Sequence, residues 1–310
     1  MHNLVMLLSL CCQSNQLIDS GIKYRRMTVT QFKKKPIEES LNVLSSRIIE
    51  NFVTLKATVD LCVKMNLAGL RIGSDLIPVI NHPDLNIDFY KLPKHVEIMH
   101  AIQAAKSAMH NSNLRFSSHP SEYISLTSEN PLVIANSVRD LEAHAFLFEL
   151  LELPETYEAP LNIHIRKDGD PVSISHTVLH NFKKCSSRVQ KRLVLENNDN
   201  RNGTWGIKNL VNYFHTQIGI PITFDNLHHK MLPQGLSEKQ AFEAAYVTWS
   251  AHRHVPLFHY SEGINDTRKH ADYATSLPPD YGMPVVWEVE LKAKDLAIKK
   301  MLHSLKKQVI

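Results

Sequence analysis

Residues 222–230 read ITFDNLHHK, and this stretch contains the pattern that decides the fold. Three residues suited to a buried strand are followed at once by Asp225, and His228 and His229 come just after it. Two interpretations are open. Either the aspartate caps the next helix and the histidines face solvent, or the three side chains belong to a metal site at the end of a strand. The rest of the chain has to decide between them.

The same pattern, a short apolar run followed by a longer amphipathic segment, recurs along the whole chain. The runs are nearly all apolar instead of alternating, as expected for parallel strands that are covered on both faces. Eight runs occur, at residues 5–11, 69–74, 114–118, 160–165, 192–195, 221–224, 256–260 and 285–289. In a chain of 310 residues they predict an α/β fold, a (β/α)8 TIM barrel that forms a single domain over residues 1–310. The short last helix, expected before Leu277-Pro278-Pro279, is the weakest unit of the pattern.

Composition places the chain among ordinary globular proteins. Hydrophobic residues make up 43% and charged residues 21%, and no apolar run approaches the ~20 residues that cross a bilayer. The net charge is only +4, so a polyanionic partner has to be met by a local basic surface. The four cysteines, at positions 11, 12, 62 and 185, form no CxxC pair and are interpreted as free thiols in a reducing compartment. The start of the chain lacks the basic residues and cleavage site of a signal peptide and is predicted to form the first strand.

Histidines and acids follow six consecutive strand candidates, from the third to the eighth. In (β/α)8 barrels the catalytic groups lie at the carboxyl ends of the strands, on one face. A single acid or histidine at a strand end is commonly a helix cap, but six consecutive ends that carry them are hard to attribute to capping. The candidates are His119, His164, Glu196, Asp225, His228, His259, His270 and Glu290.

A ring of imidazoles and carboxylates of this kind predicts bound divalent metal ions. Without a cation the acids repel one another and their burial is uncompensated. Nitrogen and oxygen donors without thiolates favour Mn²⁺, Zn²⁺ or Fe²⁺, and Mn²⁺ is our first choice. Eight ligands are too many for one ion, so we expect two or three ions that share bridging carboxylates. Such clusters serve phosphate-ester hydrolysis, and residues 222–230 are therefore interpreted as part of a metal site.

With these residues assembled, the chain resembles the UV damage endonuclease family, which shares its barrel with endonuclease IV-type AP endonucleases and xylose isomerase-like sugar enzymes. The resemblance extends from about Leu7 to Lys300. It rests on the segments LRIGSDLIPVINHP, RFSSHPSEY, NIHI, RLVLENND, PITFDNLHH, FHYSE, HADY and ELKAKD, in this order. It implies a metal-dependent enzyme that nicks damaged double-stranded DNA on the 5′ side of UV photoproducts or related lesions. It also implies a monomer without a protein partner, in the cytoplasm with the nucleoid or in the nucleus.

The resemblance further implies roles for single residues of the metal cluster. The expected catalytic residues are Glu196, His259 and Glu290. The expected ligand sets are His119, His164 and Glu196 for one ion; Glu196, Asp225, His259 and Glu290 for a second; and His228 and His270 for a third.

Contacts to the damaged DNA are expected at the mouth of the barrel, from His82, Glu122, Tyr123 and Arg71. The loop at residues 121–123 resembles the wedge with which the family probes a damaged base pair, but it reads Ser-Glu-Tyr where the family commonly has Gly-Gln. Tyr123 keeps a ring that is suited to stacking, whereas Glu122 places a negative charge beside the phosphate backbone. Cations near the strand ends are the expected phosphate contacts: Arg71, Arg115, Arg166, Lys167, Arg201 and Lys230.

Two other functions stay open. A sugar isomerase or epimerase uses the same barrel but needs only one or two metals, whereas the histidines here suffice for three ions. A lesion-binding homologue with weakened catalysis is suggested by Glu122 and by Leu257. Typical members of the family have a lysine at the latter position, two residues before the histidine of the seventh strand.

Overall fold

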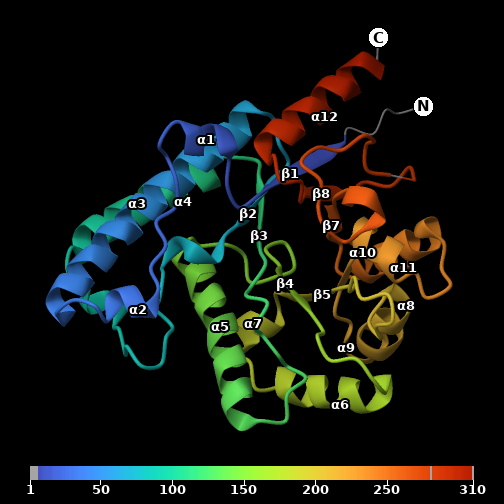
Figure 1. Cartoon of the computed structure of the whole chain (residues 1–310), viewed down its shortest axis with the longest axis horizontal. Helices are drawn as coiled ribbons and strands as arrows, with labels where there is room; N and C mark the ends of the chain where they lie inside the picture. Colours follow the sequence, from blue (N-terminus) through green and yellow to red (C-terminus); the bar gives the residue numbers. More distant parts are fainter. Residues whose placement is uncertain (1–5, 280, 309–310) are drawn as a thin grey trace.

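Eight parallel strands form a nearly closed barrel in the computed structural model, which describes residues 6–279 and 281–308 (Figure 1). Their order is β6-β5-β4-β3-β2-β1-β8-β7, so neighbours in space are also neighbours in sequence or join the two ends of the chain. The predicted (β/α)8 fold is confirmed, because every strand falls on one of the eight apolar runs; Val5, the expected start of the first run, lies outside the described residues. The strands are β1 (Leu7–Cys11), β2 (Gly69–Ile72), β3 (Arg115–Ser118), β4 (Leu161–His164), β5 (Leu193–Glu196), β6 (Ile222–Thr223), β7 (Leu257–Tyr260) and β8 (Val286–Val289).

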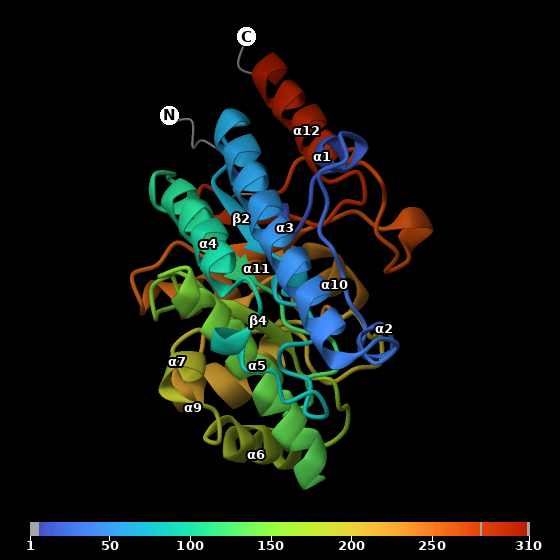
Figure 2. The ribbon, with the colours of Figure 1, turned by 90° about the vertical axis from the view of Figure 1, so that its left-hand side faces the viewer.

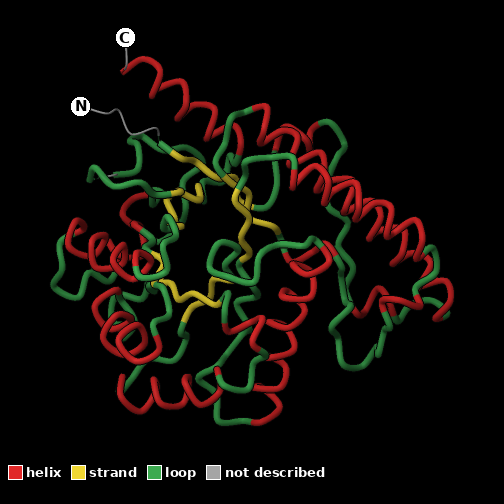
Figure 3. The backbone as a smooth tube through the Cα atoms, turned by 180° about the vertical axis from the view of Figure 1, so that it is seen from behind, coloured by secondary structure: helices red, strands yellow, loops and turns green. Residues whose placement is uncertain are grey.

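Helices form the outer layer around this ring of strands (Figure 3). The long helices α3 and α4 pack side by side over one flank of the barrel (Figure 2). The main helices are α3 (Ile37–Lys64), α4 (His95–His110), α5 (Pro131–Leu150), α6 (Pro171–Phe182), α11 (Glu238–Ser250) and α12 (Asp295–Gln308). The shorter ones are α1 (Asn15–Asp19), α2 (Val29–Phe32), α7 (Ser187–Gln190), α8 (Ile207–Leu210), α9 (Thr216–Ile218) and α10 (Asn226–Met231). None of the helices in the described residues is both long and apolar enough to cross a membrane.

The barrel has a seam between β6 and β7, where the hydrogen-bonded ladder is interrupted. These two strands are the ends of the hydrogen-bonded order, and no ladder joins them within the described residues. Their link is a parallel bridge between Asp225 and His259, in which the His259 N–H donates to the Phe224 carbonyl at 2.9 Å. The seam therefore passes through two of the predicted metal ligands.

The connection between β7 and β8 departs from the regular pattern, because its described residues contain no α-helix. Only the short turn η4 (Ile264–Asp266) is helical there, so the prediction of a helix before Leu277-Pro278-Pro279 is wrong. The loop is fastened instead by Glu262, whose carboxylate accepts N–H bonds from Thr275 and Ser276, both at 2.9 Å. In this unit the carboxylate of Glu262 thus holds the loop in place where a packed helix was expected.

The amino end of the barrel is closed by Arg115, the first residue of β3. Its buried guanidinium donates to the carbonyls of Glu158 at 2.9 Å and Tyr157 at 2.7 Å, and also to that of Val255. These carbonyls precede β4 and β7, so they lie at the end opposite to the predicted site. The prediction that Arg115 meets phosphate at the mouth of the barrel is wrong, since its donors are used in closing the other end.

Candidate metal centre

The carboxyl ends of the strands bring most of the predicted ligands together at one mouth of the barrel. Each of these residues lies near the end of a strand, directly after it, or in the first turn of the helix that follows. We call this group the cup; it consists of His119, His164, Glu196, Asp225, His228, His259 and Glu290. The predicted convergence of side chains from β3 to β8 is therefore present in the structure.

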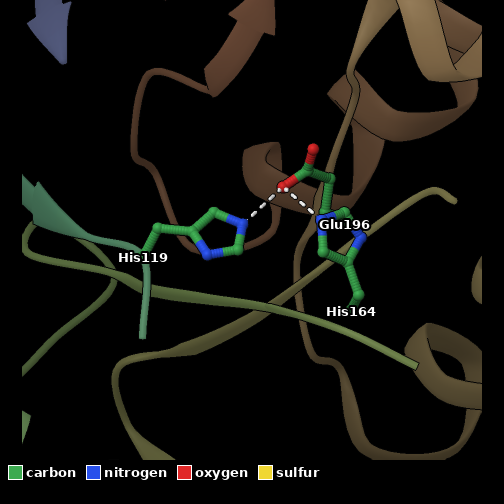
Figure 4. Close-up of side chains that lie close together, drawn as sticks. All are labelled: His119, His164 and Glu196. Carbon is green, nitrogen blue, oxygen red and sulfur yellow. Dashed lines mark hydrogen bonds and ion pairs between the residues drawn. The ribbon is translucent and has the colours of Figure 1, made fainter. Parts of the chain in front are cut away.

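Two histidines of the cup approach the same oxygen of Glu196 (Figure 4). His119 Nε2 lies 3.2 Å and His164 Nε2 lies 3.6 Å from Glu196 Oε2. One donor atom from each of the three side chains lies within 4.8 Å of the others. An ion about 2.0–2.2 Å from each donor needs a spacing of this order, so this triplet corresponds to the first expected ligand set.

A second triplet shares Glu196 with the first one, and a third shares Asp225 with the second. They are Glu196, Asp225 and His228, and then Asp225, His259 and Glu290, again with donor atoms within 4.8 Å. Glu196 and Asp225 therefore each belong to two triplets. His228 Nδ1 lies 3.2 Å from Glu196 Oε1 and 2.9 Å from the backbone carbonyl oxygen of Asn197. His228 therefore lies beside Glu196 and Asp225, and its pairing with His270, which the family resemblance implies, stays a prediction.

His270 lies at the edge of the cup, on the loop between β7 and β8. Its Nδ1 is 2.7 Å from the backbone carbonyl oxygen of Glu290 and 3.9 Å from the Oε2 atom of that side chain. A bridge to Gly263 holds it in the loop that Glu262 fastens. The position of His270 thus depends on the irregular connection described above.

The chemistry of the cup fits divalent cations. Asp225 is fully buried, and its Oδ2 atom has no hydrogen-bond partner among the described residues. Glu196 is only 1% exposed, and Glu290, which is 15% exposed, shares a triplet with Asp225, so three carboxylates are gathered in one largely buried site. Buried acids need a compensating positive charge. Imidazole nitrogens and carboxylate oxygens together are a donor set for a divalent transition-metal ion.

The electrostatics of the cup show how strongly it attracts positive charge. Burial lowers the pKa of His259, but the carboxylates of Glu196 and Glu290 outweigh burial and raise this pKa to about 10. Burial raises the pKa of Glu196, yet His259 and His164 outweigh burial and hold it well below its usual range. Burial dominates at Asp225 and raises its pKa. Protons and metal ions therefore compete for the same set of donor atoms.

A second layer of polar groups lies beneath the cup. Of its members, Arg71 was predicted as a DNA contact, whereas Glu288 and Asn162 were not predicted. Arg71 reaches the floor of the cavity, but its guanidinium donates to Glu288 and Glu290 instead of standing free for DNA. Asn162 donates to Glu196 Oε2. Glu288 and Asn162 each lie two residues before a cup ligand on β8 and β4. That spacing, which puts both side chains on the same face of a strand, is the signal in the sequence that could have found them.

The cup opens into a cavity of about 1490 Å³. Tyr123 stands on its rim with 92% of its surface exposed. Glu122, beside it, lies 3.5 Å from the guanidinium of Arg166, which also lines the cavity. His82 does not line this cavity; it lies in a neighbouring pocket of about 420 Å³ to which Tyr123 also contributes. Of the four residues expected to contact the lesion, Glu122 and Tyr123 thus lie on the rim, Arg71 lies at the floor and His82 lies in the neighbouring pocket.

The remaining cations expected to meet phosphate lie at the surface, and each faces an oxygen of the protein. Lys167 lies 3.6 Å from a carboxylate oxygen of Glu129. Lys230 pairs with the carboxylate of Asp266 at 2.6 Å, and Arg201 donates to the Asp266 carbonyl at 3.0 Å. Exposed pairs of this kind are weak, so these cations stay available to a polyanion.

The chain is similar to known proteins over nearly its whole length. The sequence profile of the UV-endonuclease UvdE family matches residues 6–309. A UV DNA damage endonuclease from Nostoc sp. is 29% identical over 289 residues, which cover 90% of this chain and 85% of that protein. The crystal structure of SacUVDE is similar with a TM-score of 0.81 at 24% identity, covering 98% of this chain and 99% of that one. A 3-keto-D-glucoside 4-epimerase from E. coli shares the fold alone, with a TM-score of 0.55 at 10% identity over 98% of this chain and 100% of that one.

Proposed function

Because the chain belongs to the UV-endonuclease UvdE family, we propose that it is a DNA repair endonuclease that nicks duplex DNA on the 5′ side of UV photoproducts or related lesions. The observation that carries this proposal is the convergence of side chains from β3 to β8 into three triplets joined by Glu196 and Asp225. Carboxylates shared between neighbouring ion sites are typical of centres that cleave phosphate esters. The relative from Nostoc sp. carries the name of that activity.

We assign two or three divalent ions to the cup, with Mn²⁺ as the first candidate and Zn²⁺ or Fe²⁺ as alternatives. When bound, they would supply a hydroxide nucleophile at neutral pH and neutralise charge on the phosphate. The triplet of His119, His164 and Glu196 would hold one ion, and the two triplets that share Asp225 would hold the others. Glu196, His259 and Glu290 are the proposed catalytic residues, because His259 Nδ1 lies 3.0 Å from a carboxylate oxygen of Glu196 and 3.6 Å from one of Glu290.

The rim residues are assigned to the damaged duplex. Tyr123 is free of the protein core, so its ring is available to fill the space of displaced bases, a contact worth about 1–3 kcal/mol per base. Arg166 and Lys167 lie close enough to the cavity to meet the phosphate backbone. His82 lies in the pocket next to Tyr123 and is assigned to the same DNA-binding rim.

We further propose that the chain acts as a monomer without a protein partner, in the cytoplasm with the nucleoid or in the nucleus. All seven cup residues come from one chain, so a complete centre needs no second copy. Light scattering of the purified protein measures this directly. A stable dimer at micromolar concentration would contradict the proposed monomer.

The test of the function is a nicking assay on UV-irradiated and abasic duplex DNA. We expect the metal-loaded protein to cut the strand 5′ to the lesion, and a chelator to abolish the cut. Glu196→Gln removes a carboxylate that two triplets share, and we expect it to lower activity by at least about 100-fold. Glu155→Gln is the matched control, because it removes an exposed carboxylate that pairs with Lys191 away from the cup. Intact damaged DNA after incubation with every metal tried would overturn the proposal.

A lesion-binding protein with weakened catalysis is the second candidate. It is favoured by Leu257, which is 1% exposed in β7 at the position where typical family members have a lysine. Binding of damaged DNA without cleavage, by protein with a full metal complement, would support this reading. A sugar isomerase or epimerase would instead be supported by a single ion per chain together with turnover of a small polyol.

A further inference from the structure

Glu288 is a buried carboxylate that belongs to none of the three ligand triplets. It lies in β8, is 1% exposed, and is paired in register with His259 on β7 and with Ser9 on β1. Side chains at the same register of neighbouring strands point to the same face of the sheet. Glu288 is therefore directed into the barrel beside His259, one layer beneath the cup.

Both oxygens of Glu288 are engaged by named partners. Oε1 accepts the hydroxyl of Ser117, and Oε2 accepts the guanidinium of Arg71. Oε2 also lies 3.2 Å from His259 Nε2. The opposite nitrogen of that ring, Nδ1, lies 3.0 Å from Glu196 Oε2. The imidazole of His259 thus has one nitrogen toward the cup and the other toward Glu288.

This arrangement decides which nitrogen of His259 is free for a metal. A metal-bound imidazole uses one nitrogen as the ligand and carries a proton on the other, and that N–H needs an acceptor when it is buried. Neither ring nitrogen makes a hydrogen bond within the described residues, and the carboxylate within reach of Nε2 is that of Glu288, at 3.2 Å. A proton on Nδ1 would instead point into the cup and block the ligand position.

We propose that Glu288 is a positioning residue that accepts the Nε2–H of His259 and so presents Nδ1 to the metal centre. The inference rests on the proposed metal-dependent function. On β7 itself the residue two positions before the histidine is Leu257, whose apolar side chain cannot accept a hydrogen bond. The acceptor for His259 therefore comes from Glu288 on the adjacent strand.

Arg71 makes this buried carboxylate tolerable and ties it to the cup. Its guanidinium binds Glu288 and Glu290 at once, so a single cation compensates two acids. The side chain of Arg71 is 7% exposed, that of Glu288 1% and that of Glu290 15%. A buried charge is costly unless it is paired and hydrogen-bonded. The pair also links the position of Glu290, a member of the third triplet, to that of Glu288.

The first test reads the tautomer of His259 directly. Protein with ¹⁵N-labelled histidine is loaded with Zn²⁺, which is diamagnetic, and the two-bond ¹H–¹⁵N correlations of the ring are assigned with the help of His259→Ala. We expect a metal-bound Nδ1 and a protonated Nε2 in the wild type. A protonated Nδ1 in metal-loaded protein would overturn the proposal, and this reading needs no Glu288 variant that folds.

The second test measures metal affinity by competition with a chelator, and the visible spectrum of bound Co²⁺. We expect Glu288→Gln to weaken binding by about 10-fold, because the amide keeps an acceptor but loses the charge, and Glu288→Leu by up to about 100-fold. Ser9→Ala is the matched control in the same layer, since the Ser9 hydroxyl has no hydrogen-bond partner among the described residues. It should bind Co²⁺ as the wild type does.

The outcomes separate this inference from the function on which it rests. In a His259→Ala background, Glu288→Gln should weaken binding much less than it does in the wild type, because its contact with His259 is gone and only its link to Glu290 through Arg71 remains. Wild-type affinity and an unchanged Co²⁺ spectrum in both Glu288 variants would sink the positioning role while leaving the nuclease proposal standing. Failure of the wild type to bind Zn²⁺, Mn²⁺ or Co²⁺ at all would sink both.

Discussion

Glu122 is the residue whose chemistry is most at odds with a DNA-binding rim. It is an exposed acid that lies 3.5 Å from Arg166, a cation of the cavity wall. Because exposed ion pairs contribute little to folding, this pair has little effect on the stability of the barrel. Its effect should fall on the substrate, since the acid repels phosphate and occupies the cation nearest to it.

We therefore expect Glu122→Gln to bind duplex DNA more tightly at low salt. The slope of log K against log salt concentration should become steeper by about one, because one more cation is free to neutralise a phosphate. Fluorescence anisotropy over a salt series measures both quantities. Glu155→Gln removes an equivalent surface charge away from the rim and should leave the slope unchanged. Equal slopes for wild type and Glu122→Gln would show that Glu122 does not face the DNA.

At this scale the sequence predicted well which side chains gather in the cup, and it predicted their neighbours poorly. His119, Glu196 and Glu290 stand where an apolar run stops, and a polar residue at that point is conspicuous. Glu288 and Arg71 lie inside such runs, where a charged side chain has no local signal of its partner. Their pairing depends on the register between β8, β1 and β2. That register is set by the closed barrel and cannot be read from any single segment.

Among the elements, the connection between β7 and β8 is the one that sequence periodicity misjudged. An amphipathic pattern indicates a helix only where the segment can pack, and here a loop is stabilised by the side chain of Glu262. That carboxylate also accepts the hydroxyls of Thr275, Ser276 and Tyr260. Hydrogen bonds between one acid and residues 13 to 14 positions away produce no periodic pattern in the sequence, so they could not be predicted from it.

Glu262→Gln should loosen this loop and make the free energy of unfolding less dependent on pH in the acidic range. Burial raises the pKa of Glu262, but hydrogen bonds from Thr275 and Ser276 outweigh burial and lower it. A group with a lowered pKa stabilises the fold above its unfolded pKa of about 4.3 and loses that contribution as the pH falls through its folded value. We expect the variant to be less stable than the wild type by about 1–2 kcal/mol at pH 7, and the difference to shrink below about pH 4.

Urea denaturation at several pH values measures this difference in the free energy of unfolding. Glu243→Gln, which removes an exposed acid that pairs with Lys239 within α11, serves as the control. A destabilisation of the same size at pH 3 and at pH 7 would mean that the charge of Glu262 is not what fastens the loop. Because the same loop carries His270, metal content should be measured in parallel.

For the molecule as a whole, eight apolar runs were enough to identify a barrel, because closure of parallel strands covered by helices has few alternatives. What the runs do not reveal is how well each pair of strands is joined. The link between β6 and β7 consists of the Asp225–His259 bridge, and these two residues also belong to one ligand triplet. Two residues of the proposed metal centre thus also form the link between β6 and β7.

Metal loading should consequently protect the seam more than the rest of the sheet. In chelated protein we expect the amides of Asp225 and His259 to exchange with solvent faster than the amide of Leu10, which lies in β1 between two paired strands. Ligation by both residues opposes local opening, and at a metal concentration 100 times the Kd this adds about 2.7 kcal/mol, or about 100-fold slower exchange. Hydrogen exchange followed by NMR, with and without Zn²⁺, measures this. Glu196→Gln tests whether the effect needs an intact cluster, because it removes a carboxylate that two triplets share and leaves the backbone hydrogen bond between His259 and Phe224 in place. Equal protection of Asp225 and Leu10 in chelated protein would contradict the idea that ions hold the barrel closed at this line.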